Sequence, residues 1–96
     1  MKDEMVLVVI EMTKEMLEAE GLSVDEIDEQ TRLYGDGGLF DSMGIVSLIV
    51  AVEQEIQDRY GRSVALADER ALSRSSSPYR TVSTLAEYAA DSAETA

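Results

Sequence analysis

The chain has 96 residues, of which 45% are hydrophobic, and its 20 acidic and 8 basic residues give a formal net charge of -12. This length suits one small domain with a buried core, and the charge disfavours nucleic acid and anionic membranes while it favours proteins with basic docking faces. The absence of Cys excludes disulfides and thiolate metal sites, and the absence of His removes the commonest general base and metal ligand.

A first helix is predicted over residues 3–20. Asp3 and Glu4 suit its positive end, and Gly21 suits the position after its last turn. Its apolar segment 5–10 is too short to span a bilayer, so we expect a cytoplasmic protein without stable membrane insertion. We also expect a monomer. An apolar stripe recurs at helical spacing and should face the core; it comprises Met5, Val8, Val9, Met12, Met16 and Ala19.

Residues 22–41 form a long connection whose apolar residues should anchor it to the bundle. Its acidic residues lack the order of acids, glycine and closing Glu that a calcium-binding loop needs, so a solvated acidic loop is predicted and no metal site. The expected anchors are Leu22, Val24, Ile27, Leu33, Leu39 and Phe40.

A second helix is predicted from Ser42 to about residue 59. Asp41 suits its N-cap, which places Ser42 on the first turn with its hydroxyl toward water. At 100° per residue, one stripe should face the core; it comprises Ile45, Leu48, Ile49, Val52 and Ile56.

The same helix carries a second apolar strip, formed by Met43, Val46 and Val50. The strip lies beside Ser47 and Glu53, on the side where a helix of a small domain is normally polar. Another part of the chain could cover the strip, but we favour a docking surface for a partner.

The rest of the chain should add a short third helix over 64–72, with Val64, Leu66 and Leu72 pointing inward. A turn or flexible loop is predicted over 73–78, followed by a last helix that Thr81 caps. We expect a single domain over 1–90 and a frayed acidic tail over 91–96. The inward face of the last helix should comprise Val82, Leu85, Tyr88 and Ala89.

The residues Asp41-Ser42-Met43, followed by a long hydrophobic helix, resemble the Asp-Ser-Leu signature and recognition helix of acyl carrier proteins. The similarity extends over most of the chain, because the segment from Thr81 to Tyr88 also resembles the last helix of that family. The resemblance implies an all-α fold: a small four-helix bundle with a long loop between helices 1 and 2 and a short third helix.

The resemblance also implies that a separate phosphopantetheinyl transferase attaches 4′-phosphopantetheine from coenzyme A to Ser42. The protein would then carry acyl groups as thioesters between enzymes of a fatty-acid, lipid or polyketide-type pathway. The helix N-terminus should favour the phosphodiester while Asp36 and Asp41 repel it, so we expect a loosely held arm. We expect acyl-transferring or acyl-activating enzymes to contact Asp41, Met43, Val46, Ser47, Val50 and Glu53.

The chain departs from the familiar fatty-acid carriers at Gly44 and Ser47, where those carriers commonly present acids, and in extra residues around 73–80. A specialised stand-alone carrier fits these differences better, and an aminoacyl cargo is an alternative. Another alternative is an interaction module, an acidic adaptor or a nucleic-acid mimic, that uses the strip without modification. An enzyme is disfavoured, because no paired-acid motif, metal spacing or activated nucleophile is found, so no catalytic residue is assigned.

Overall fold

A computed structural model describes residues 2–21, 26–35, 37–67 and 78–95 of the chain. Within these residues the fold is all-helical, with α1 over Lys2–Ala19, α2 over Ser42–Tyr60 and α4 over Val82–Thr95. The described residues form no strand longer than an isolated bridge. The all-α prediction is therefore confirmed for this part of the chain.

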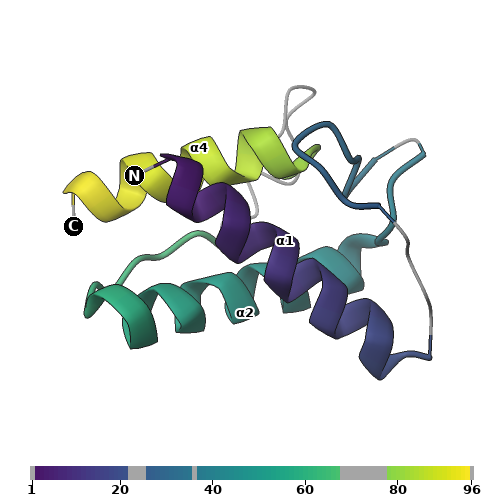
Figure 1. The fold of residues 1–96 in the computed structure, drawn as a ribbon, viewed down its shortest axis with the longest axis horizontal. Coiled ribbons are helices and arrows are strands. Elements are labelled where there is room, and N and C mark those ends of the chain that lie inside the picture. The colour runs from purple at the N-terminus through teal and green to yellow at the C-terminus, as the bar shows by residue number, and fades with distance from the viewer. Residues whose placement is uncertain (1, 22–25, 36, 68–77, 96) are drawn as a thin grey trace.

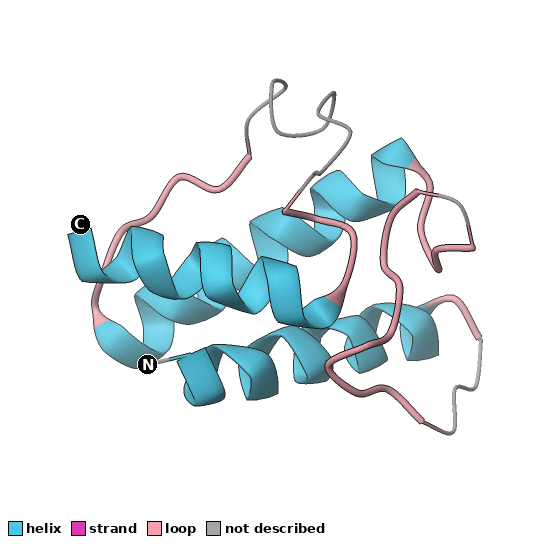
Figure 2. Cartoon of the chain, turned by 90° about the horizontal axis from the view of Figure 1, so that it is seen from above, coloured by secondary structure: helices cyan, strands magenta, loops and turns pink. Residues whose placement is uncertain are grey.

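Helices α2 and α4 run in the same direction, and α1 crosses them diagonally in the opposite sense (Figure 1). The starts of α2 and α4 consequently lie at the same end of the molecule, where the loop after α1 also lies (Figure 1). Seen from above, the connection between α1 and α2 lies at this end, whereas the segment after α2 runs back along the helices (Figure 2). Ser42 therefore begins α2 at an end of the bundle that loops surround.

The core is mainly aliphatic, with Phe40 and Tyr79 as its aromatic members, and lies where the three helices meet. All five residues predicted for the core stripe of α2 are fully buried. On α1 the predicted stripe is buried except at its end, where Met16 is half-buried and Ala19 is exposed, so the prediction was wrong for Ala19. The last turn of α1 extends beyond the helices that could cover it (Figure 1).

The connection between α1 and α2 is held to the start of α4 by backbone hydrogen bonds. The amide of Leu33 donates to the carbonyl of Arg80 at 2.7 Å, and the amide of Val82 donates to the carbonyl of Thr31 at 3.1 Å. Ile27, Leu33 and Phe40 are buried as expected. These contacts fix the loop that leads into α2.

Not every predicted anchor of that connection is buried. Leu39 is 40% exposed, so its prediction as an anchor was wrong. Its neighbour Phe40 points into the core instead, since successive residues of an extended segment face opposite sides. Leu22 and Val24 lie outside the described residues.

Helix α4 begins with a reciprocal cap. The amide of Thr84 donates to Oγ1 of Thr81 at 3.2 Å, and the amide of Thr81 donates to Oγ1 of Thr84 at 3.0 Å. This arrangement satisfies one helical amide and fixes the entry of the chain, as a capping box does. The prediction that Thr81 caps this helix is confirmed.

A frayed tail was expected over 91–96, and the structure continues α4 to Thr95. Ala93 is fully buried, and the Nη1 atom of Arg62 donates to its carbonyl at 2.7 Å. A side-chain donor that binds one of the last carbonyls stabilises a helix end. The end of α4 is thus held by a residue distant in sequence.

The segment after α2 differs from the predicted third helix. Residues 64–67 are not helical, which corrects the predicted start of that helix, and residues 68–72 lie outside the described residues. Val64 is half-buried and Leu66 is fully buried, as expected for inward-facing residues. The segment returns from the end of α2 between α2 and α4 (Figure 1).

Ionic contacts join α1 and α2 on the outside of the core. The guanidinium of Arg59 contacts Glu11 of α1 and Oε1 of Glu55, the latter at 2.7 Å. Hydrogen bonds to Glu55 and Glu11 raise the pKa of Arg59 above its ordinary value, and partial burial together with Glu4 raises the pKa of Tyr60. Among the described residues, no helix is long and apolar enough to cross a membrane.

Candidate functional site

Ser42 is the first residue of α2, and its side chain is exposed. Asp41 precedes it as the N-cap, with φ -81° and ψ -175°, and its Oδ1 accepts a hydrogen bond from the amide of Gly44 at 2.8 Å. The N-cap prediction is confirmed. This cap satisfies one of the orphan amides of the first turn and sets where the helix begins, which holds the Ser42 hydroxyl at the helix end.

Gly44 allows the loop to pack closely against the first turn of α2. A Cβ at this position would lie 3.1 Å from both Cβ and Cδ1 of Phe40 and 3.3 Å from Oδ1 of Asp41. Phe40 is buried, so its ring cannot move away easily. Glycine is therefore the residue that lets Phe40 enter the core while Asp41 caps the helix.

Gly38 has a comparable role in the loop that precedes α2. A Cβ there would lie 2.8 Å from the amide nitrogen of Tyr34 and 2.9 Å from the carbonyl oxygen of Leu33. The close approach permits the amide of Phe40 to donate to the carbonyl of Leu33 at 2.8 Å. The glycine-rich loop therefore has a structural reason: it delivers Phe40, Asp41 and Ser42 in a defined register.

The predicted strip on α2 is exposed along its length. Met43 is 80% exposed, Val46 36% and Val50 51%. Ser47 is also exposed, and the helical wheel places it about 40° from Met43, at the edge of the strip. Leu39, in the loop before Ser42, is a further exposed apolar residue.

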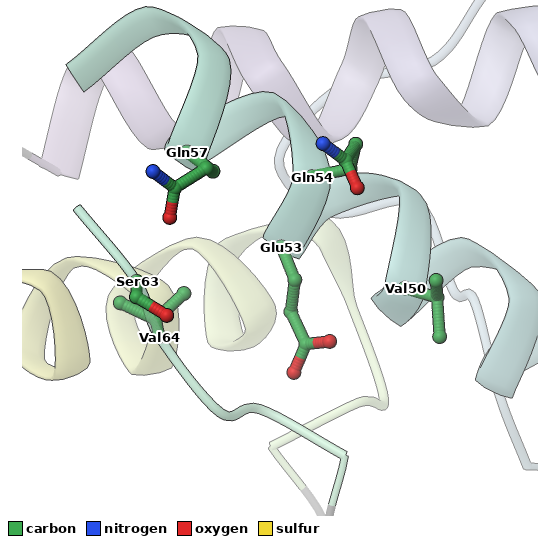
Figure 3. A pocket seen from close by; sticks show the side chains of 6 residues that line it. All are labelled: Val50, Glu53, Gln54, Gln57, Ser63 and Val64. Carbon is green, nitrogen blue, oxygen red and sulfur yellow. The ribbon is translucent and has the colours of Figure 1, made fainter. Parts of the chain in front are cut away.

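Glu53 was predicted to contact a partner, and the structure shows that it already holds the chain itself. Its Oε2 accepts hydrogen bonds from the amides of Leu66 and Ala67. Figure 3 shows its carboxylate between α2 and the returning segment. Glu53 therefore ties the non-helical segment 61–67 to the last half of α2.

Beside Glu53 lies a groove of about 190 Å³ between α2 and the returning segment (Figure 3). Val50 belongs both to the exposed strip and to this groove. The groove was not predicted, because it requires the position of a segment that local sequence patterns did not supply. Its lining comprises Val50, Glu53, Gln54, Gln57, Ser63 and Val64.

Tyr79 was not singled out from the sequence, yet it is among the largest fully buried side chains. Its hydroxyl donates to the carbonyl of Leu66, and its ring centroid lies 6.1 Å from that of Tyr88. The peptide groups of Leu66 are thus held on both sides, by Glu53 at the amide and by Tyr79 at the carbonyl. An aromatic residue within a polar, Ser-rich stretch was the signal that could have identified Tyr79.

The predicted site residues lie at the start of α2 and along it, but two of them have contacts within the chain. Ser42, Met43, Val46, Ser47 and Val50 are exposed. By contrast, the carboxylates of Asp41 and Glu53 accept backbone hydrogen bonds. Asp36 lies outside the described residues.

No family model matches the chain, and neither a curated protein nor a solved structure matches it. A function for this protein must consequently be argued from its own residues and their geometry. The exposed hydroxyl of Ser42 and the exposed strip beside it are the features with which that argument begins.

Proposed function

We propose that this protein is an acyl carrier whose Ser42 hydroxyl receives 4′-phosphopantetheine from coenzyme A. The observation that carries the proposal is an exposed serine at the first position of a long capped helix, within the Asp41-Ser42-Met43 sequence that resembles the carrier signature. A carrier of this kind is the substrate of a transferase and a shuttle for other enzymes. It needs only to present its hydroxyl.

The residues around Ser42 fit such an attachment. The side chain of Ser42 is exposed at the end of the bundle, so a transferase can approach it. When attached, phosphopantetheine supplies the thiol that forms thioesters, a group that this Cys-free chain lacks. The start of a helix is also a favourable place for a phosphodiester.

Asp41 limits how tightly that phosphodiester is held. Its carboxylate already accepts the amide of Gly44, so this helical amide does not bind the phosphate. The negative charge of Asp41 also stands next to the attachment point and opposes the attraction of the helix N-terminus. A weakly held arm can swing between enzymes, as a carrier requires.

The exposed strip provides a surface on which partner enzymes dock. Met43, Val46 and Val50 offer apolar contact area close to Ser42, and the net charge of -12 favours partners with basic faces. Apolar patches bordered by polar residues commonly mark interaction sites. The strip thereby orients Ser42 toward the active site of each enzyme.

A second candidate is an acidic adaptor that binds partners through the same strip and is never modified. The 80% exposure of Met43 favours it equally, since an apolar docking residue serves both functions. An aminoacyl cargo, or an acyl cargo of a fatty-acid, lipid or polyketide-type pathway, would use the same attachment point. Only the chemistry at Ser42 separates carrier from adaptor.

The experiment that tests the proposal is incubation with coenzyme A, Mg²⁺ and a broad-specificity phosphopantetheinyl transferase, followed by intact-protein mass spectrometry. A carrier gains the mass of one phosphopantetheine, and the Ser42→Ala variant does not. A folded protein that stays unmodified would favour the adaptor.

A further inference from the structure

The start of α4 holds the loop before Ser42 through peptide groups that are hydrogen-bonded on both sides. The first of them is the peptide group between Arg80 and Thr81. Its N–H donates to Oγ1 of Thr84 at 3.0 Å, and its carbonyl accepts the amide of Leu33 at 2.7 Å. The hydroxyl of one exposed residue on α4 therefore orients the peptide group that holds the connection between α1 and α2.

A second peptide group, between Arg32 and Leu33, continues this path toward the candidate site. Its N–H is the donor to Arg80, and its carbonyl accepts the amide of Leu39 at 3.1 Å. The carbonyl of Leu33 in turn accepts the amide of Phe40 at 2.8 Å. Three segments that are distant in sequence are thus joined side by side by backbone hydrogen bonds.

The path ends at the cap of α2. Phe40 is buried and directly precedes Asp41, whose Oδ1 accepts the amide of Gly44 at 2.8 Å. Ser42 is the next residue along the chain. Hydrogen bonds in such a chain polarise one another, so each of them strengthens its neighbours. The loss of the contact at Thr84 should therefore weaken the contacts next to Ser42.

We propose that Thr84 is a positioning residue for the attachment reaction at Ser42, because its hydroxyl fixes, through this path, the loop that delivers Ser42 to the start of α2. The inference rests on the proposed function and deepens it. The helical amide at the start of α4 is capped by Thr81, so the hydroxyl of Thr84 is not needed for that contact. Thr84 acts through Leu33 and Phe40 and not on the reacting hydroxyl.

The test compares two variants of Thr84 by NMR hydrogen exchange. Thr84→Val keeps the shape of the side chain but removes the hydroxyl, whereas Thr84→Ser keeps the hydroxyl. The side chain is exposed, so neither change disturbs the core. In Thr84→Val the amides of Leu39 and Phe40 should exchange about fivefold faster, as the loss of one hydrogen bond predicts. Thr84→Ser should exchange as the wild-type protein does.

Arg62→Met is the matched control, because it removes a contact at the other end of the same helix. Arg62 donates to the carbonyl of Ala93 at 2.7 Å. This variant should loosen the end of α4 and leave the exchange of Leu39 and Phe40 unchanged. Equal acceleration in Arg62→Met and Thr84→Val would overturn the proposal, since both would then reflect a general loss of stability. Exchange at the wild-type rate in Thr84→Val would overturn it as well.

The effect on the reaction is measured with coenzyme A, Mg²⁺ and the phosphopantetheinyl transferase. Thr84→Val should lower kcat about tenfold, because even a small displacement of a reacting group slows a transfer strongly. The KM for the carrier should stay unchanged, since the exposed strip of α2 is intact. Thr84→Ser should restore the wild-type kcat. Faster exchange in Thr84→Val together with an unchanged kcat would overturn the positioning role.

The exchange experiment uses the unmodified protein and needs no transferase. A wild-type protein that is never modified would refute the proposed function, yet its variants would still show whether Thr84 holds Leu39 and Phe40. Conversely, a wild-type protein that is modified, with a Thr84→Val variant that behaves identically, would refute the positioning role alone. The two failures are therefore distinguishable.

Discussion

The carboxylate of Asp41 accepts a hydrogen bond from the amide of Gly44 at 2.8 Å, across the residue that carries the candidate attachment hydroxyl. This single contact ends the loop, begins α2 and sets the position of Ser42. It also places a negative charge where a phosphodiester would be attached. The same residue thereby organises the site structurally and weakens its hold on an anionic arm.

Removal of this cap should destabilise the protein. We expect Asp41→Ala to lower the free energy of unfolding by about 1 kcal/mol, because a helical amide loses its acceptor. Asp41→Asn should lower the free energy of unfolding much less, since the side-chain oxygen of Asn can also cap the helix. Urea denaturation followed by circular dichroism measures both, and equal stabilities of Asp41→Ala and the wild-type protein would contradict the role of the cap.

Gly44→Ala should also destabilise the protein, against the usual helix propensity. Alanine in a helix is normally more stable than glycine by about 1 kcal/mol. Here its Cβ would meet the buried Phe40 at 3.1 Å, and overpacking typically costs about 1–3 kcal/mol. We therefore expect a net loss of about 1 kcal/mol in the same denaturation experiment.

The matched control is Ser47→Ala, at an exposed position of the same helix. It should leave stability unchanged or raise it by a few tenths of a kcal/mol, roughly the difference in propensity. If Gly44→Ala stabilises the protein more than Ser47→Ala does, the close packing of Phe40 on the first turn is not restrictive.

Val46→Glu should separate docking from folding. The exposed fraction of Val46 is 36%, so a carboxylate there stays in water, and stability should change by about 0.5 kcal/mol or less. The rate of modification by the transferase should fall by about tenfold, the effect of one lost apolar interface contact. Intact-protein mass spectrometry of samples quenched at successive times measures this rate.

Val52→Glu is the contrasting variant, because Val52 is fully buried and an unpaired carboxylate in the core should unfold the protein. Gross unfolding of Val46→Glu would instead show that the strip is covered in solution. A folded Val46→Glu variant that is modified at the wild-type rate would show that the transferase does not use the strip.

Tyr79→Phe should show how much the hydrogen bond to the carbonyl of Leu66 contributes to the free energy of unfolding. The ring still packs against Tyr88, but the carbonyl of Leu66 loses its donor, which should cost about 1–2 kcal/mol of unfolding free energy. Tyr88→Phe keeps the ring contact and should change stability by about 0.5 kcal/mol or less. Similar losses in the two variants would argue that the hydroxyl of Tyr79 contributes nothing specific.

The sequence predicted α2 well because its determinants are local. Spacing along one helix predicts Asp41 as the cap and Ser42 on the first turn. It also predicts the division into a buried stripe and an exposed strip. The cap of α4 by Thr81 could be predicted for the same reason.

The features that were missed depend on contacts between distant segments. Glu53 looked like a free carboxylate on the wheel, but its partners are the amides of Leu66 and Ala67, on a segment whose path the sequence did not reveal. The end of α4 looked polar and was expected to fray, yet Ala93 is buried and Arg62 binds its carbonyl. Leu39 and Phe40 were both expected as anchors, and only Phe40 is buried.

The central claim is that Ser42 is an attachment point, and peptide mapping tests it most directly. After incubation with coenzyme A, Mg²⁺ and the transferase, tandem mass spectrometry should find one phosphopantetheine on the peptide that contains Ser42. Ser83→Ala, a serine variant on α4, should be modified as the wild-type protein is, and Ser42→Ala should not be modified. Modification at another serine, or none on a folded wild-type protein, would contradict the account.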